Sequence, residues 1–210
     1  CHNPDTWAKT EGEMKSAEEI LQQALRYKRY WGKKGGITVS GGEALLQIDF
    51  VTELFTLAKE KGVNTCLDTS GNPFTREEPF YSKFEKLMEV TDLFMLDIKE
   101  IDEDEHKQLT GQTNKNILDM ATCLSDHGKA MWIRHVLVPG ITDDDGQLHR
   151  LRAFIDTLKT VERVEILPYH TLGVFKWKEL GIPYALEDVE PPTKEQVEHA
   201  REIIIPDYKS

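Results

Sequence analysis

The stretch DLFMLDIK at residues 92–99 decides the fold, because it is an apolar, strand-like run that ends in charged side chains. Four further runs repeat this plan: ITVSGGE (37–43), NTCLDTSG (64–71), AMWIRHVLVPG (130–140) and RVEILPYH (163–170). The segments between these runs have the residue spacing of helices, and such alternation is typical of parallel βα units. The sequence therefore predicts an α/β fold with about five parallel strands and helices on the outside.

The bulk composition is that of one folded domain covering residues 1–210. Hydrophobic residues make up 39% of the chain, and no linker-like segment divides it. The 37 acidic residues outnumber the 26 basic ones, and the formal charge of −11 argues against nucleic acid or an anionic membrane as a partner. No apolar run is long enough to span a bilayer, and three cysteines without a CxxC pair favour a reducing, cytoplasmic location.

Helix start signals place the predicted helices between the strand runs. Ser16 with Glu19, and Thr193 with Gln196, form capping boxes that begin the first and the last helix. Long connections remain at 100–113, which holds a short helical piece, and at 171–192, which we interpret as either a lid or a packed surface loop. Helices are expected over about 16–31, 47–61, 79–90, 114–127, from 143–145 onward, and 193–204.

The polar ends of the strand runs predict a binding site, because the carboxyl ends of parallel strands meet on one face of the fold. Alternate residues of a strand share a face, so Met95, Asp97 and Lys99 project together. Asp97 and Lys99 either form a private ion pair or bind a ligand, and we favour the ligand. Lys99 and Arg134 suit a carboxylate, and Asp97 suits ribose hydroxyls. The side chains expected to meet at this mouth are Glu43, Asp68, Asp97, Lys99, Arg134 and His170.

Several residues near the strand ends have both a functional and a structural interpretation. Gly41 and Gly42 let a ligand approach the main chain closely, or they make an ordinary turn. Asp68 and Thr69 form a turn or the polar rim of the site, and His170 is a ligand-contacting or a structural histidine. The cysteines interpreted as small core residues are Cys66 and Cys123.

Taken together, these segments resemble the pyruvate formate-lyase activating enzymes, the glycyl-radical-enzyme activases of the radical S-adenosylmethionine family. The resemblance covers nearly the whole chain and implies a partial (β/α) barrel in which five of six strands are visible. The motifs that carry it, in chain order, are CHNPDTW (1–7), SGGEA (40–44), CLDT (66–69), MLDIK (95–99), WIR (132–134), VPG (138–140) with the aspartates at 143–145, and LPYH (167–170).

The resemblance implies a specific chemistry. Three thiolates hold a [4Fe–4S] cluster, and the remaining iron binds the amino and carboxylate groups of S-adenosylmethionine. The reduced cluster splits S-adenosylmethionine into methionine and a 5′-deoxyadenosyl radical, which removes hydrogen from one backbone glycine of pyruvate formate-lyase. The implied partners are pyruvate formate-lyase and a small electron-transfer protein such as flavodoxin or ferredoxin.

The resemblance also assigns roles to individual residues. Cys1 is expected to ligate iron, and His2 to lie beside the adenosyl group. Gly41, Gly42 and Glu43 are expected to receive the methionyl amino group. The expected catalytic residues, which also hold the ribose and carboxylate region, are Asp97, Lys99, Arg134 and His170. Thr69 and Ile98 complete the expected cofactor-binding set. The residues expected to surround a small monovalent cation are Asp68, Thr69, Met95 and Asp97.

One departure from the family pattern is clear. CHNPDTW looks like the end of a CxxxCxxC cluster motif of which only the third cysteine, Cys1, is visible. We therefore expect the polypeptide as given to lack the cluster and the first strand, and to be inactive, although its parent enzyme is active.

Three other functions remain open at the level of the sequence. The first is an activase for a different glycyl radical enzyme, which would use the same chemistry. The second is a barrel lyase that uses Lys99 as a Schiff-base amine with Asp97 or His170 as acid or base. The third is a non-catalytic fragment that only binds S-adenosylmethionine or the partner.

Overall fold

The computed structural model describes residue 4, residues 12–32 and residues 35–205, and it contains one five-stranded sheet. The strands are β1 (Gly36–Val39), β2 (Asn64–Thr69), β3 (Leu93–Asp97), β4 (Met131–Leu137) and β5 (Val161–Pro168). The longer helices are α1 (Ala17–Leu25), α2 (Ile48–Glu60), α3 (Phe80–Val90), α5 (Lys115–Asp126), α6 (Asp145–Ile155) and α8 (Lys194–Ile204). The shorter ones are η2 (Lys28–Tyr30), η3 (Ala44–Gln47), α4 (Glu103–Thr110) and α7 (Val174–Glu179).

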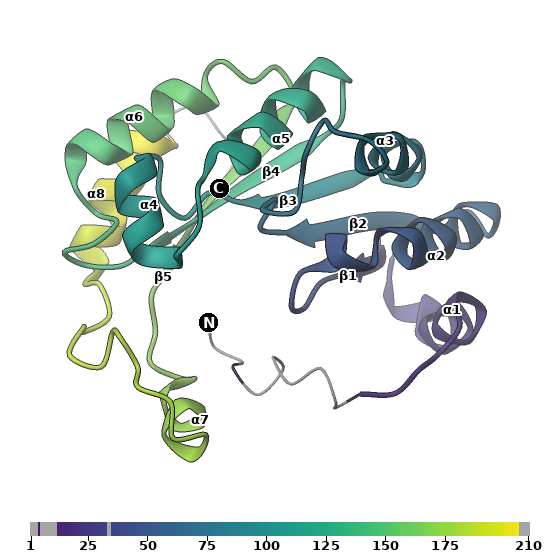
Figure 1. The fold of residues 1–210 in the computed structure, drawn as a ribbon, viewed down its shortest axis with the longest axis horizontal. Coiled ribbons are helices and arrows are strands. Elements are labelled where there is room, and N and C mark those ends of the chain that lie inside the picture. The colour runs from purple at the N-terminus through teal and green to yellow at the C-terminus, as the bar shows by residue number, and fades with distance from the viewer. Residues whose placement is uncertain (1–3, 5–11, 33–34, 206–210) are drawn as a thin grey trace.

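All neighbouring strands pair in parallel, and their order in the sheet, β1-β2-β3-β4-β5, is their order in the chain. The prediction of five parallel strands with helices outside is confirmed. Figure 1 shows most of the helices along the outer side of a curved sheet, with α1 and α7 at the two ends of the arc. All strands point the same way, so the loops that follow them gather at one edge.

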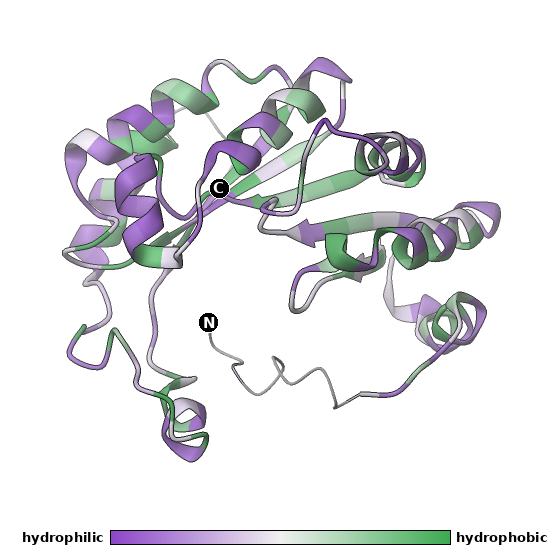
Figure 2. Cartoon of the chain, viewed as in Figure 1, coloured by the Kyte–Doolittle hydropathy of each residue, from purple (hydrophilic) through white to green (hydrophobic). Residues whose placement is uncertain are grey.

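Alternation along the strands separates the two faces of the sheet. In β4, Met131, Ile133 and Leu137 are fully buried, whereas Trp132 and Arg134 are only partly buried. In β3, Phe94 and Leu96 are fully buried in the same way. Figure 2 shows the resulting concentration of hydrophobic residues along the central strands. The face turned to the helices is therefore the hydrophobic core, and the other face carries the polar side chains.

The predicted capping boxes are confirmed at both ends of the chain. The Ser16 side chain accepts from the Glu19 N–H while the Glu19 carboxylate accepts from the Ser16 N–H, and Thr193 and Gln196 repeat the arrangement at α8. The first helix is shorter than predicted, because α1 ends at Leu25 and only the 3₁₀ turn η2 follows. No residue of η2 is buried, so packing does not favour its extension into an α-helix.

The two long connections contain helices of their own. The expected short helical piece is α4, and Asp102 caps it by accepting from the Asp104 and Glu105 N–H groups. The segment that follows β5, for which no periodicity was found, contains α7. None of the residues of α7 is buried. Among the described residues no helix has the length and apolarity needed to cross a membrane.

Candidate active site

The carboxyl ends of β2, β3 and β4 bring charged side chains into direct contact. Strand register places Asp97 opposite Arg134 and Asp68 opposite Met95. The Arg134 guanidinium donates from Nε to Asp97 Oδ1 at 2.9 Å and from a terminal nitrogen to Asp68 Oδ1. Lys99 Nζ lies 3.3 Å from Asp97 Oδ2. We call these four residues, Asp68, Asp97, Lys99 and Arg134, the strand-end cluster.

The strand-end cluster is partly buried, and this burial changes the pKa of one of its carboxylates. The side chains of Asp68, Asp97 and Arg134 are between 17% and 22% exposed, and that of Lys99 is 38% exposed. Burial raises the pKa of Asp68, and the charges of Asp97 and Glu43 act in the same direction, while Arg134 opposes them. Arg134 thus holds together carboxylates that would otherwise repel one another.

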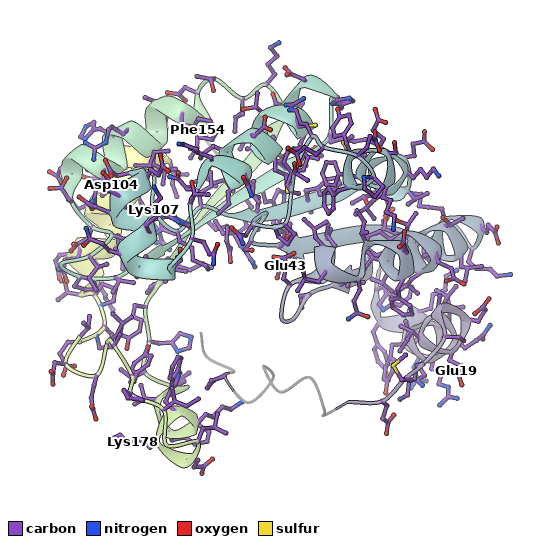
Figure 3. All side chains as sticks on the ribbon, in the orientation of Figure 1. Glu19, Glu43, Asp104, Lys107, Phe154 and Lys178 are labelled. Carbon is purple, nitrogen blue, oxygen red and sulfur yellow. The ribbon has the colours of Figure 1, made fainter. Side chains whose placement is uncertain are left out.

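Glu43 joins the loop after β1 to the end of β2. Its Oε1 accepts from the Leu45 N–H at 3.0 Å and from the Thr69 hydroxyl at 2.5 Å. Its Oε2 accepts from the Ser70 N–H at 2.9 Å and from the Ser70 hydroxyl at 2.5 Å. Figure 3 places Glu43 near the ends of the strands, on the open side of the sheet. Both carboxylate oxygens are therefore held in place by two neighbouring loops.

Gly41 and Gly42 shape the main chain just before Glu43. Their φ angles are 96° and 53°, in the region that side-chain-bearing residues rarely adopt. A Cβ built on either glycine meets no atom within 4 Å, so the space in front of this turn is open. The turn therefore presents main-chain groups that a ligand can approach closely.

The remaining predicted residues lie at or near the same strand ends. Thr69 is buried against Glu43, and Met95 is partly buried on the strand face that carries Asp97. Ile98 is buried, and its carbonyl accepts from a ring nitrogen of His135 at 2.9 Å. His170 follows β5 and is exposed, with its Nδ1 accepting from the Leu172 N–H at 3.4 Å. The predicted residues Cys1 and His2 lie outside the described residues.

We predicted that side chains at the carboxyl ends of several strands lie close together. Direct contacts support this for Asp68, Asp97, Lys99 and Arg134. Ser70 was not among the predicted residues, although it donates twice to Glu43. Its position in DTSG signals a turn, but nothing in the sequence identifies a partner 27 residues away. The loop after β2 therefore contributes more to the site than its motif indicated.

The prediction of a core position is confirmed for Cys123 and is wrong for Cys66, which lies on the same strand face as Asp68. Cys123 is fully buried, and Cys66 is partly buried in β2. Burial raises the pKa of both thiols, which keeps them protonated. Among the described residues no group of three or more His, Cys, Asp or Glu side chains could hold a metal ion.

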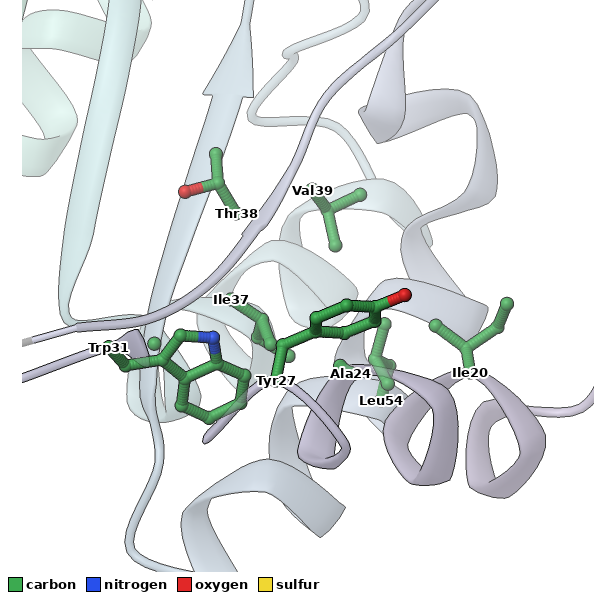
Figure 4. A pocket seen from close by; sticks show the side chains of 9 residues that line it. Ile20, Ala24, Tyr27, Trp31, Ile37, Thr38, Val39 and Leu54 are labelled. Atoms are coloured by element: carbon green, nitrogen blue, oxygen red, sulfur yellow. The ribbon is translucent and has the colours of Figure 1, made fainter. Parts of the chain in front are cut away.

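One apolar pocket lies beside β1 and contains no residue of the strand-end cluster. It has a volume of about 240 Å³, and it lies between α1 and β1, lined by residues that include Tyr27, Trp31 and Leu54 (Figure 4). None of the predicted site residues lines it. The charged strand ends, rather than this pocket, are therefore the candidate site.

Comparison with known proteins places this chain in a family. The model of the Radical SAM superfamily matches residues 1–151. The pyruvate formate-lyase-activating enzyme of Streptococcus mutans is 56% identical over 206 residues, which cover 97% of this chain and 78% of the relative. The enzyme of the same name from Listeria monocytogenes is 50% identical over 205 residues, covering 97% and 83%.

A solved structure agrees at the level of the fold. A crystallised domain of a pyruvate-formate lyase-activating enzyme from Bacteroides vulgatus superposes with a TM-score of 0.65 at 20% identity, covering 80% of this chain and 92% of that one. Because the family model matches most of the chain and the relatives are similar over nearly all of it, this protein belongs to the radical S-adenosylmethionine superfamily and, within it, to the family of pyruvate formate-lyase activating enzymes.

Proposed function

We propose that this chain is an activating enzyme that forms a 5′-deoxyadenosyl radical from S-adenosylmethionine and removes hydrogen from a backbone glycine of pyruvate formate-lyase. Membership of the family implies a [4Fe–4S] cluster and S-adenosylmethionine as cofactors. The observation that carries the proposal for this chain is the strand-end cluster beside the open Gly41–Gly42 turn.

The charge of the strand ends complements the charge of the ligand. Glu43, Asp68 and Asp97 contribute three carboxylates, and Lys99 and Arg134 contribute two cations, so the site has a net charge of −1 when all are ionised. S-adenosylmethionine carries a sulfonium, an ammonium and a carboxylate, and hence a net charge of +1. Opposite charges of equal size favour binding and fix the orientation of the ligand.

Each residue of the site has a chemical group to offer. Lys99 uses one N–H toward Asp97, and its other two can donate to the ligand carboxylate. Asp97 retains a lone pair on each oxygen beyond those used by Arg134 and Lys99, and these accept from ribose hydroxyls. The Gly41 and Gly42 carbonyls accept from the methionyl ammonium, next to the carboxylate of Glu43.

The proposal extends to the other expected contacts. When bound, the cluster supplies the electron that splits the sulfonium. Cys1 ligates it, and His2, Thr69, Ile98 and His170 surround the cofactor. A small monovalent cation would lie near Asp68, Thr69, Met95 and Asp97, two of which contact Arg134. A flavodoxin or ferredoxin in the cytoplasm supplies the electron, and the chain forms a single domain.

Isotope transfer tests the reaction. Enzyme that carries all three cluster cysteines of the family is loaded with the cluster and mixed with S-adenosylmethionine, a reductant and pyruvate formate-lyase that is deuterated at glycine. The expected result is a glycyl radical signal together with one deuterium in the 5′-deoxyadenosine that forms. Product without deuterium would refute hydrogen removal from glycine.

A lysine variant tests the site. Lys99→Gln removes the positive charge that faces the ligand carboxylate, so the affinity for S-adenosylmethionine should fall about tenfold, equivalent to about 1.4 kcal/mol. The matched control is Lys86→Gln, because Lys86 is exposed on α3 outside the strand-end cluster. Equal affinities for S-adenosylmethionine in the two variants, measured by calorimetry, would contradict the assignment of Lys99.

A further inference from the structure

Two buried polar side chains lie behind the strand-end cluster, on the face turned to the helices. Burial alternates at the end of β3, where Asp97 and Lys99 are partly buried and Glu100 is 1% exposed. The same alternation in β4 leaves Arg134 partly buried and His135 3% exposed. A glutamate and a histidine so deeply buried need partners within the protein.

Both ring nitrogens of His135 contact main-chain carbonyl oxygens. Nδ1 lies 2.9 Å from the carbonyl oxygen of Ile98, and Nε2 lies 3.0 Å from that of Thr142. A carbonyl oxygen only accepts hydrogen bonds, so both contacts are hydrogen bonds only when each ring nitrogen carries a proton. The neutral ring has one N–H and would turn a lone pair toward a buried carbonyl. The geometry therefore fits a positively charged imidazolium.

Glu100 supplies the negative charge that a buried imidazolium needs. Burial raises the pKa of Glu100, and the charge of His135 acts against this increase, because the two side chains are close. Oε1 accepts from the Asp102 N–H at 2.9 Å, whereas Oε2 has no hydrogen-bond partner among the described residues. A proton on Oε2 would have no acceptor, which favours the ionised carboxylate. The two charges cancel, so the pair leaves the net charge of the strand ends unchanged.

The first acceptor of His135 lies between two ligand-facing residues in the chain. The Ile98 N–H donates to the Arg134 carbonyl at 2.9 Å, and the Ile98 carbonyl accepts from His135. The first bond fixes the peptide group that joins Ile98 to Asp97, and the second fixes the peptide group that joins it to Lys99. Both come from adjacent residues of β4. The main chain that carries the ligand-facing side chains is therefore held on both sides.

The second acceptor is held by the loop that follows β4. Thr142 Oγ1 donates to the Val136 carbonyl at 2.7 Å and accepts from the Val138 N–H at 2.8 Å. Thr142 is 1% exposed, so water does not replace His135 as the donor to its carbonyl. His135 thus joins the end of β3 to a loop of fixed conformation.

We infer that His135 is a positioning residue for the S-adenosylmethionine site, and that as an imidazolium neutralised by Glu100 it holds the main chain that presents Asp97 and Lys99. This inference rests on the proposed function, which assigns those two residues to the ligand. His135 and Glu100 lie on the opposite face of the strand ends, so they act through Ile98 rather than by contact with the ligand.

Nuclear magnetic resonance of the 210-residue chain labelled with ¹⁵N-histidine tests the charge. At pH 7 both ring nitrogens of His135 should carry a proton, and the signal is assigned by its loss in His135→Gln. Glu100→Gln keeps the size of the side chain and removes the counter-charge, so His135 should change to the neutral form with one N–H. The matched control is Glu89→Gln, exposed on α3, which should leave both protons in place. A neutral His135 in the wild type, or a charged one in Glu100→Gln, would overturn the inference.

Ligand affinity tests the positioning. Calorimetry uses enzyme that carries all three cluster cysteines of the family and is loaded with the cluster. The affinity for S-adenosylmethionine should fall about fivefold in Glu100→Gln and in His135→Gln, and stay unchanged in Glu89→Gln. The double variant should lose little more than either single variant, because both changes act on the same hydrogen bonds. Unchanged affinity in both single variants, or fully additive losses, would overturn the inference.

The outcomes separate this inference from the proposed function. A wild-type enzyme that binds S-adenosylmethionine but forms no 5′-deoxyadenosine refutes the proposed function, while the affinities of the variants still decide the role of His135. An active wild-type enzyme with a neutral His135 refutes the inference alone. Urea denaturation shows which variants are folded. If His135→Gln does not fold, Glu100→Gln decides the inference, since it leaves the ring in place and should change both the spectrum and the affinity.

Discussion

Replacing Arg134 with methionine removes the cation that two strand-end carboxylates share. Arg134 donates to Asp97 and to Asp68, and Lys99 remains beside Asp97 after the change. Among the described residues, Arg134 is the one side chain shown donating a hydrogen bond to Asp68. Arg134→Met therefore leaves Asp68 as a partly buried carboxylate without its donor, and methionine fills much of the space of the lost side chain.

The expected loss of stability is about 2–3 kcal/mol. Unit charges 2.9 Å apart, as in Arg134 and Asp97, attract by about 6 kcal/mol at an effective dielectric constant of 20, before the cost of desolvation. Removing one partner of a fully buried pair costs about 3–5 kcal/mol. The carboxylates of Asp68 and Asp97 keep about a fifth of their surface exposed, and Lys99 still compensates Asp97, so the expected loss lies at or below the lower end of this range.

The effect should depend on pH in a definite direction. Burial raises the pKa of Asp68 in the folded protein, and loss of Arg134 raises it further. The folded variant then binds a proton at a higher pH than the unfolded chain, so its unfolding free energy increases as the pH falls toward the unfolded pKa. The difference between wild type and variant is therefore largest near pH 7 and smaller near pH 4.5.

Urea denaturation followed by circular dichroism at both pH values measures these differences. Arg134→Met combined with Asp68→Asn should recover at least half of the loss, because it removes the unpaired carboxylate. Arg150→Met, on the exposed side of α6, is the control and should change the unfolding free energy by less than about 0.5 kcal/mol. A loss below about 1 kcal/mol for Arg134→Met, or a loss that is the same at both pH values, would refute the reasoning.

Three further substitutions test other parts of the structure by the same urea assay. Glu43→Gln replaces one acceptor oxygen with an amide nitrogen that cannot accept from Ser70, so the unfolding free energy should fall by about 1–3 kcal/mol. An unchanged unfolding free energy would contradict a stabilising role for the two hydrogen bonds from Ser70 to Glu43. Burial acts to raise the pKa of Asp92, but hydrogen bonds from Lys59 and Thr65 outweigh it and hold that pKa below 3.8. The stability lost in Asp92→Asn should therefore be present above about pH 4 and vanish as the pH falls further, and a loss that persists at pH 2 would disprove this. Phe84→Ala should cost about 3–5 kcal/mol because the ring is fully buried, and a loss under 1 kcal/mol would show that the core refills the space.

The sequence predicts the framework of this fold well because local signals and burial agree. The five strand runs and the two capping boxes depend on residue types within a few positions of each other, and all are found where predicted. The length of α1 was overestimated, because the residues after Leu25 have helical spacing but gain no burial from continuing the helix.

The candidate site is predictable in outline and not in its pairings. Strand alternation predicts that Asp97 and Lys99 lie together, and they do. The double contact of Arg134 depends on the register between separate strands, and the clamp between Glu43 and Ser70 joins loops 27 residues apart. Contacts between separate strands and loops depend on tertiary packing, and a motif within one segment does not predict them.

The identity of strand order and chain order has a consequence for biosynthesis. Each strand after β1 pairs with the strand that precedes it in the chain, so β2 and β3 can join before β4 has been translated. Arg134 follows Asp97 by 37 residues and Asp68 by 66, so at 5–20 residues per second the nascent sheet waits about 2–7 s for this guanidinium after Asp97 has been added. During that interval Lys99 is paired with Asp97 but Asp68 lacks the donor that it has in the finished sheet, and β4 supplies that donor when Arg134 is added.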